Sequence, residues 1–126
     1  MPGVLRLPAR LHGGLIAHAA ASPDEEVCGL LAGRDGLPDQ QIPVTNALRR
    51  ADAFDMDPAE LIAAMRHLRE SGRELVAIYH SHPASAPYPS QTDTAHNQYP
   101  EAIHLLIGRE GGDWRVRGFR IDEGVE

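Results

Sequence analysis

Two histidines, one residue apart, open the stretch HSHPASAPYPSQTD, residues 80–93, which ends with a serine and an aspartate nearby. Side chains two apart on a strand point to the same face, so His80 and His82 can share one ligand. Together with Asp93, two imidazoles and a carboxylate form a three-ligand set for zinc that leaves the fourth position for water. The same residues also have an explanation without a metal: two surface histidines, and a capping box with Ser90 at the N-cap.

A water activated by a metal also needs a base. Glu25 and Glu26 stand directly before the apolar run VCGLL. One carboxylate held beside zinc could accept the proton of the water and pass it to a leaving amine. Two solvated carboxylates at the start of a strand are the plainer interpretation. The residues alone do not choose between these alternatives.

Other side chains that could do chemistry fit a site less well. Cys28 could act as a thiol nucleophile with a histidine, but a lone cysteine in an apolar strand is usually a core residue. His96, one helical turn after Asp93, is a rival metal ligand. His104, inside AIHLLI, is expected to be a core histidine that could also support the site. Three histidines on predicted helices are expected to face the solvent: His12, His18 and His67.

The composition predicts one compact domain. The chain has 126 residues, of which 42% are apolar. Its 18 acidic and 12 basic residues give a net charge of −6, which argues against nucleic acid as a partner. Every basic residue is an arginine, which excludes a lysine nucleophile, and the single cysteine excludes an intramolecular disulfide. No apolar run approaches the ~20 residues that span a bilayer, so we expect a soluble, cytoplasmic protein without membrane contact.

Strands are predicted where short apolar or alternating runs end in turn residues, at 26–33, 40–47, 74–80, 103–108 and 113–121. The pair Asp35–Gly36 predicts a hairpin between the first two strands. Pro43 places the second strand at a sheet edge or a bulge, because proline cannot donate to a central ladder. An exposed edge strand of this kind could also pair in a homodimer.

Helices are predicted at 9–22 and 57–71, with a third, short one after residue 90. The first has apolar residues at helical spacing, although Gly13 and Gly14 weaken it. The second has Asp57 as N-cap, Pro58 in the first position, and Glu60 to complete a capping box. Its core stripe and its end are Leu61, Met65, Leu68 and Gly72. Helices and strands mixed in this order predict an α/β fold, a mixed sheet with helices packed on it.

The spacing of His80, His82, Ser90 and Asp93 resembles the JAMM motif, also called MPN+. The stretch EEVCGLLAG resembles the upstream Glu-x-Cys-Gly block of that family, which selects Glu26 as the functional glutamate. PVTN before the long helix and FDMDPAEL at its start are also similar to the family. The resemblance covers about residues 5–120, and it implies a single JAMM/MPN+ domain over 1–126 with a fold similar to cytidine deaminase.

The resemblance also implies a zinc metalloprotease with one zinc per chain. In this family's pattern His80, His82 and Asp93 bind zinc, Glu26 holds and deprotonates the water, and Ser90 donates a hydrogen bond to the oxyanion. Family members cut peptide or isopeptide bonds after the C-terminal Gly-Gly of ubiquitin or a ubiquitin-like protein. Short members resemble enzymes that act on sulfur-carrier proteins, which is the substrate class we expect.

Two other functions compete with this one. A scaffold or binding module could keep the fold and pocket without turnover, although the intact ligand set speaks against it. A zinc hydrolase acting on a small molecule is the other alternative. The deaminase signature His-x-Glu with Pro-Cys-x-x-Cys is absent, which disfavours a hydrolase that deaminates a base.

Overall fold

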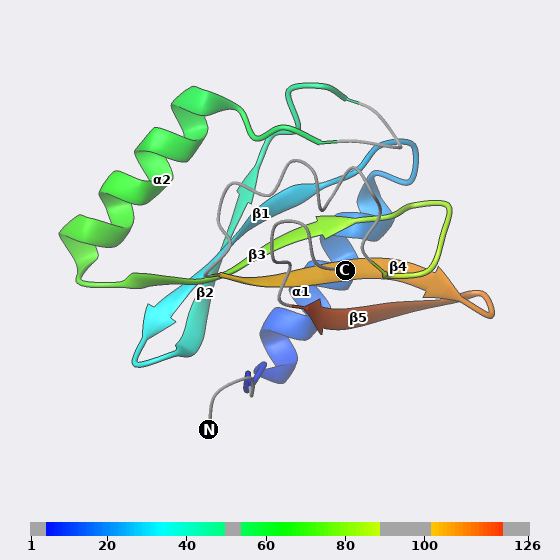
Figure 1. The fold of residues 1–126 in the computed structure, drawn as a ribbon, viewed down its shortest axis with the longest axis horizontal. Coiled ribbons are helices and arrows are strands. Elements are labelled where there is room, and N and C mark those ends of the chain that lie inside the picture. Colours follow the sequence, from blue (N-terminus) through cyan, green and yellow to red (C-terminus); the bar gives the residue numbers. More distant parts are fainter. Residues whose placement is uncertain (1–4, 50–53, 89–101, 120–126) are drawn as a thin grey trace.

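A computed structural model describes residues 5–49, 54–88 and 102–119. Within these residues the chain forms one five-stranded mixed sheet and two helices (Figure 1). The elements are α1 (Ala9–Ala21), β1 (Cys28–Arg34), β2 (Leu37–Val44), α2 (Pro58–Ser71), β3 (Glu74–Ser81), β4 (Ile103–Glu110) and β5 (Asp113–Phe119). The predicted α/β class is confirmed. The short helix predicted after residue 90 lies outside the described residues.

The sheet has the order β2-β1-β3-β4-β5, with only β3 and β4 parallel. β1 therefore has a strand on each side, and it pairs antiparallel with both β2 and β3. β2 is an edge strand, as Pro43 predicted. Its pairing begins earlier than expected, at Arg34 and Leu37, because Asp35 and Gly36 both adopt positive φ, 56° and 76°, in a tight two-residue turn.

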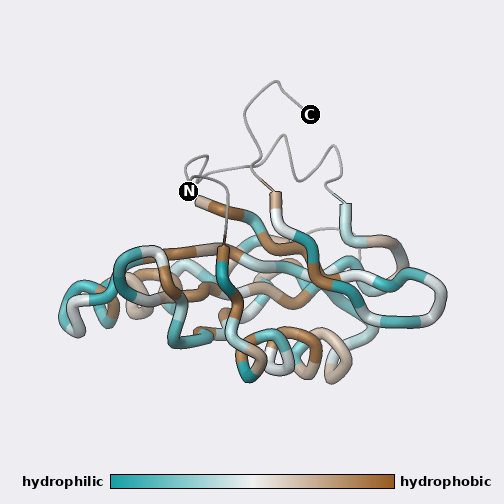
Figure 2. The backbone as a smooth tube through the Cα atoms, turned by 90° about the horizontal axis from the view of Figure 1, so that it is seen from below, coloured by the Kyte–Doolittle hydropathy of each residue, from teal (hydrophilic) through white to brown (hydrophobic). Residues whose placement is uncertain are grey.

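Each face of the sheet carries its own apolar cluster. α1 contributes Leu15 and Ala19 to one cluster, and α2 contributes Ala64 to the other. Residues of β1 and β3 supply both clusters, because successive side chains of a strand point to opposite faces. Figure 2 shows hydrophobic residues concentrated along the strands of the sheet. Residues of β1 and β3 next to each other in sequence thus belong to different layers.

Both helices follow from local signals. Gly14 does not interrupt α1; a Cβ there would meet the Gln41 side chain of β2, so glycine allows the close approach of helix and strand. Asp57 caps α2 by accepting a hydrogen bond from the Glu60 amide at 3.0 Å, and Gly72 ends the helix with φ 71°. The other half of the predicted capping box, a hydrogen bond from the start of the helix to the Glu60 carboxylate, is wrong. The Glu60 carboxylate accepts from the Thr45 amide at 2.9 Å instead.

Neither helix among the described residues is long and apolar enough to cross a membrane. His12 and His67 are exposed, as predicted. The solvent-facing prediction for His18 is wrong. It stands one turn after the buried Leu15, so this edge of α1 rests on the sheet, and its Nδ1 lies 2.7 Å from the Tyr79 hydroxyl.

Candidate metal centre

The three residues Glu26, His80 and His82 meet where β3 ends and the chain enters β1. Cys28 and His80 are partners in the antiparallel β1–β3 register. Continued by two residues, that register places Glu26 opposite His82, and between these two pairs the Ser81 amide donates to the Val27 carbonyl at 3.0 Å. All three side chains therefore lie on the α2 face of the sheet. They are buried, with relative exposures of 4%, 1% and 7%.

The donor atoms of these side chains converge. One ligand atom from each of Glu26, His80 and His82 lies within 4.8 Å of the other two. The two Nε2 atoms are 3.2 Å apart, and the imidazole rings meet edge to face at 61°. Two imidazoles and a carboxylate are ligands that zinc prefers. The cluster could therefore hold a metal ion.

The loop after β3 supplies an outer partner for His82. Its Nδ1 lies 3.2 Å from the Ala86 carbonyl. A carbonyl oxygen can only accept, so in a neutral imidazole a hydrogen bond from Nδ1 leaves the lone pair of Nε2 for a ligand. Histidines that bind metals usually have such an outer partner. The ring of His80 is held differently, by stacking on Phe54 with ring centroids 4.4 Å apart and 25° between the planes.

Gly108 of β4 lets this loop lie close to the sheet. A Cβ at Gly108 would stand 2.5 Å from the Pro87 nitrogen and 2.6 Å from the Ser85 carbonyl oxygen. We expect Gly108→Ala to push the loop away, to destabilise the fold by ~1–3 kcal/mol and to weaken metal binding by ~10–100-fold. Urea unfolding and zinc titration measure both effects. Gly13→Ala is the matched control, since a Cβ there meets nothing within 4 Å.

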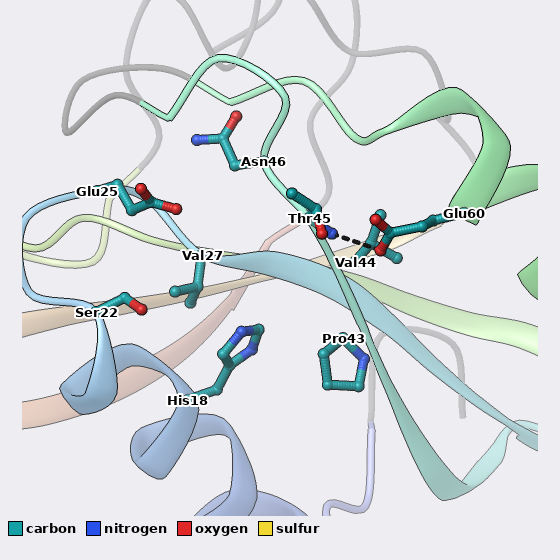
Figure 3. A pocket seen from close by; sticks show the side chains of 9 residues that line it. All are labelled: His18, Ser22, Glu25, Val27, Pro43, Val44, Thr45, Asn46 and Glu60. Atoms are coloured by element: carbon teal, nitrogen blue, oxygen red, sulfur yellow. Dashed lines mark hydrogen bonds between the residues drawn. The ribbon is translucent and has the colours of Figure 1, made fainter.

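Glu25 and Glu26 point to different surroundings. Glu25 is half-buried and lines a cavity of about 210 Å³ with His18 and Ser22, whereas Glu26 faces the histidines. Figure 3 shows the Glu25 carboxylate at one side of this cavity, with His18 of α1 at another. The two neighbouring glutamates are thus separated by the alternation of the strand that follows them.

Cys28 lies beside the Glu26, His80 and His82 side chains but is a core residue, as expected. Its Sγ is fully buried and lies 3.3 Å from the Val44 carbonyl, to which the thiol donates. Burial first, and then the charges of Glu26 and other nearby carboxylates, raise the pKa of this thiol to about 12. A thiol with that pKa is not ionised at neutral pH and is a poor nucleophile.

We therefore expect Cys28→Ala to keep turnover within ~3-fold of the wild type, because no nucleophile is lost. The native thiol should also resist alkylation by iodoacetamide at pH 7.5 and react after unfolding. Mass spectrometry of the labelled protein checks the second point. Loss of turnover in Cys28→Ala with unchanged metal content and melting temperature would contradict this assignment.

Several predicted residues are not placed here. Ser90, Asp93 and the rival ligand His96 lie outside the described residues, and the ligand roles of His80, His82 and Asp93 stay predictions. His104 is 6% exposed and is paired in register with Ile78, as expected of a core histidine.

Asn46 and Phe54 were not predicted as site residues, although they stand in the stretches PVTN and FDMDPAEL that resemble the family. Asn46 is 2% exposed and its side chain hydrogen-bonds to the main chain near Glu26. A buried-looking polar residue at the end of an edge strand is a weak signal. Its partner at the site, the Glu26 carbonyl, is distant in sequence, so no local pattern identifies that contact.

Comparison with known proteins decides the family. Residues 8–121 match the family model described as prokaryotic homologs of the JAB domain, which is most of the chain. The chain belongs to this family. It is 36% identical over 125 residues to the CysO-cysteine peptidase of Mycobacterium tuberculosis, covering 97% of this chain and 86% of that protein.

Other relatives agree with this family assignment. The desampylase of Haloferax volcanii is 33% identical over 114 residues, covering 85% of this chain and 82% of the relative. The solution structure of a Desulfitobacterium hafniense protein superposes with a TM-score of 0.81 at 30% identity, covering 92% and 83% of the two chains. This JAB-family chain is accordingly a peptidase or isopeptidase.

Proposed function

We propose that this JAB-family protein is a zinc-dependent peptidase or isopeptidase that cuts after the C-terminal Gly-Gly of a ubiquitin-like or sulfur-carrier protein. The observation that carries the proposal is the convergence of Glu26, His80 and His82 within 4.8 Å at one buried point of the fold. Two imidazoles and a carboxylate are ligands that zinc prefers. Their donor atoms lie close enough together for one ion to contact all of them.

Each site residue has a distinct role in the proposed reaction. His80, His82 and Asp93 would hold zinc, and the Nδ1 hydrogen bond of His82 to Ala86 orients one ligand in advance. When bound, zinc polarises a carbonyl and lowers the pKa of a water molecule toward ~7. Glu26 would accept a proton from that water and deliver it to the leaving amine. Ser90 would donate a hydrogen bond to the oxyanion.

The substrate class is supported by the relatives. One is named for cysteine attached to CysO and another as a desampylase, and both align over most of their length. We infer for this chain a carrier with the ubiquitin fold and a flexible Gly-Gly end, because the cluster is buried and two glycines need less room to approach it than residues with larger side chains. The proposed setting is the cytoplasm.

The deciding experiment incubates the zinc-loaded protein with a ubiquitin-like carrier extended by one residue beyond Gly-Gly. Mass spectrometry should show the carrier ending at Gly-Gly, and a chelator should stop the reaction. The matched substrate replaces Gly-Gly with Ala-Ala and should be cut much more slowly. A carrier linked to a lysine side chain separates isopeptidase from peptidase activity.

Two results would contradict the proposal. Cleavage that persists in the chelator excludes a metal-dependent reaction. Stoichiometric zinc with no turnover on any carrier favours the scaffold alternative. The predicted homodimer is a separate point, which light scattering tests; β2 is the edge strand that such a dimer would use.

A further inference from the structure

The peptide unit that joins Glu26 to Val27 is held by two side chains. Its carbonyl, that of Glu26, accepts a hydrogen bond from Nδ2 of Asn46 at 3.0 Å. Its amide, that of Val27, donates to Oγ of Ser81 at 2.9 Å. The two side chains come from opposite neighbours of β1, Asn46 from two residues past the end of β2 and Ser81 from the end of β3.

Both side chains form hydrogen bonds to the backbone just before the regular hydrogen-bond ladder of β1 begins. β1 starts at Cys28, so the Glu26–Val27 peptide precedes the strand. Buried main-chain groups must find partners, and here side chains provide them. The rotation of this peptide helps to set ψ of Glu26, and with it the direction in which the Glu26 side chain leaves the backbone.

Asn46 also bonds to the segment that precedes α2. Its Oδ1 accepts from the amides of Leu48 and Asp55 at 3.0 and 3.1 Å. Asp55 adjoins Phe54, whose ring stacks on His80. One buried amide thus connects the backbone of the proposed base to the segment that packs against a proposed metal ligand. Figure 3 shows Asn46 above the strand end, with its nitrogen on the side of the Glu25 segment.

We infer that Asn46 and Ser81 are positioning residues that hold Glu26 in register with His80 and His82. This inference rests on the proposed function, since both side chains would affect turnover by positioning Glu26, the proposed base. A displacement of about 1 Å in a catalytic group can cost ~10²-fold in rate. Neither side chain is assigned a contact with substrate, so the effect should fall on kcat rather than KM.

Asn46→Asp removes the donor and keeps the shape, and Ser81→Ala removes the acceptor of the Val27 amide. We expect each change to lower kcat by ~10–100-fold with KM within ~3-fold and zinc content unchanged. Gln41→Glu is the matched control. Gln41 also donates from its amide to a main-chain carbonyl, that of Gly14 at 3.3 Å, but on the α1 side of the sheet. The kcat of Gln41→Glu should stay near the wild-type value.

A double-mutant cycle separates positioning from general damage. In the Glu26→Gln background, Asn46→Asp and Ser81→Ala should each change kcat by less than ~3-fold, because the group they position is already gone. Equal fold-losses in both backgrounds would overturn the inference. Melting temperatures identify a variant that fails to fold, in which case the other variant decides.

A second measurement does not depend on activity. In the metal-free and the zinc-loaded protein, Ser81→Ala should speed hydrogen exchange of the Val27 amide by at least ~10-fold, because its acceptor is removed. The Leu31 amide, inside β1, should be unchanged. Unchanged exchange at Val27 would refute the inference by itself. If instead exchange responds but the wild type shows no metal-dependent turnover, the proposed function fails and the catalytic part of the inference fails with it.

Discussion

Glu26→Gln is expected to lower turnover by ~10²–10⁴-fold, the usual contribution of a positioned acid–base group. Glutamine keeps the size and hydrogen bonding of the side chain but cannot accept the proton. The fold should be unchanged, because the backbone contacts of Glu26 with Asn46 and Ser81 do not involve its carboxylate. Steady-state rates on the extended carrier, with zinc content and melting temperature, measure the effect.

Glu25→Gln is the control for this change. It removes the same charge one residue away, from a side chain that lines the cavity with His18 rather than the histidine pair. It should be nearly silent. If Glu25→Gln abolishes turnover while Glu26→Gln does not, the glutamates have been assigned in the wrong order. If Glu26→Gln also releases zinc, Glu26 is a metal ligand rather than a base.

Replacing a histidine of the pair should abolish metal binding and turnover together. His80→Gln and His82→Gln each remove an imidazole donor from a cluster whose Nε2 atoms are 3.2 Å apart. Loss of an outer partner alone costs ~10–100-fold in metal affinity, so loss of a ligand should cost at least ~10²-fold. Zinc per chain, measured after dialysis, should fall from about one to near zero.

Thermal unfolding supplies a readout that is independent of substrate. A chelator should lower the melting temperature of the wild type, because a metal bound to the folded state stabilises it. The same chelator should leave both histidine variants unchanged. His67→Gln is the control, since this histidine is exposed on α2 and its Nε2 contacts Gln40. Full zinc occupancy in His80→Gln or His82→Gln would contradict the assigned ligands.

Local signals predicted most of the elements correctly. Asp57 and Pro58 start α2, and Gly72 ends it, because capping depends on a few adjacent residues. Asp35–Gly36 predicted the hairpin for the same reason. The predictions that failed depended on partners far along the chain. Glu60 was expected to bond within its own helix, but the Thr45 amide competes for its carboxylate.

His18 shows the same limit on the other face of the sheet. It was expected to face the solvent, and only packing against Tyr79 decided that it is half-buried. Burial lowers the pKa of His18 and raises that of Tyr79. Neither shift is visible in a sequence, because each depends on what the rest of the chain places around the group.

The sequence by itself supplied the candidate donor residues and determined that His80 and His82 share a face, because strand alternation is a local property. Only the tertiary structure decided that Glu26 lies opposite His82 and that Asn46 and Ser81 hold the backbone between them. β2 and α2 separate β1 from β3 in the chain. Their register is set by two apolar clusters on opposite faces, and a slip of one residue would exchange those faces and turn Glu26 away from the histidines.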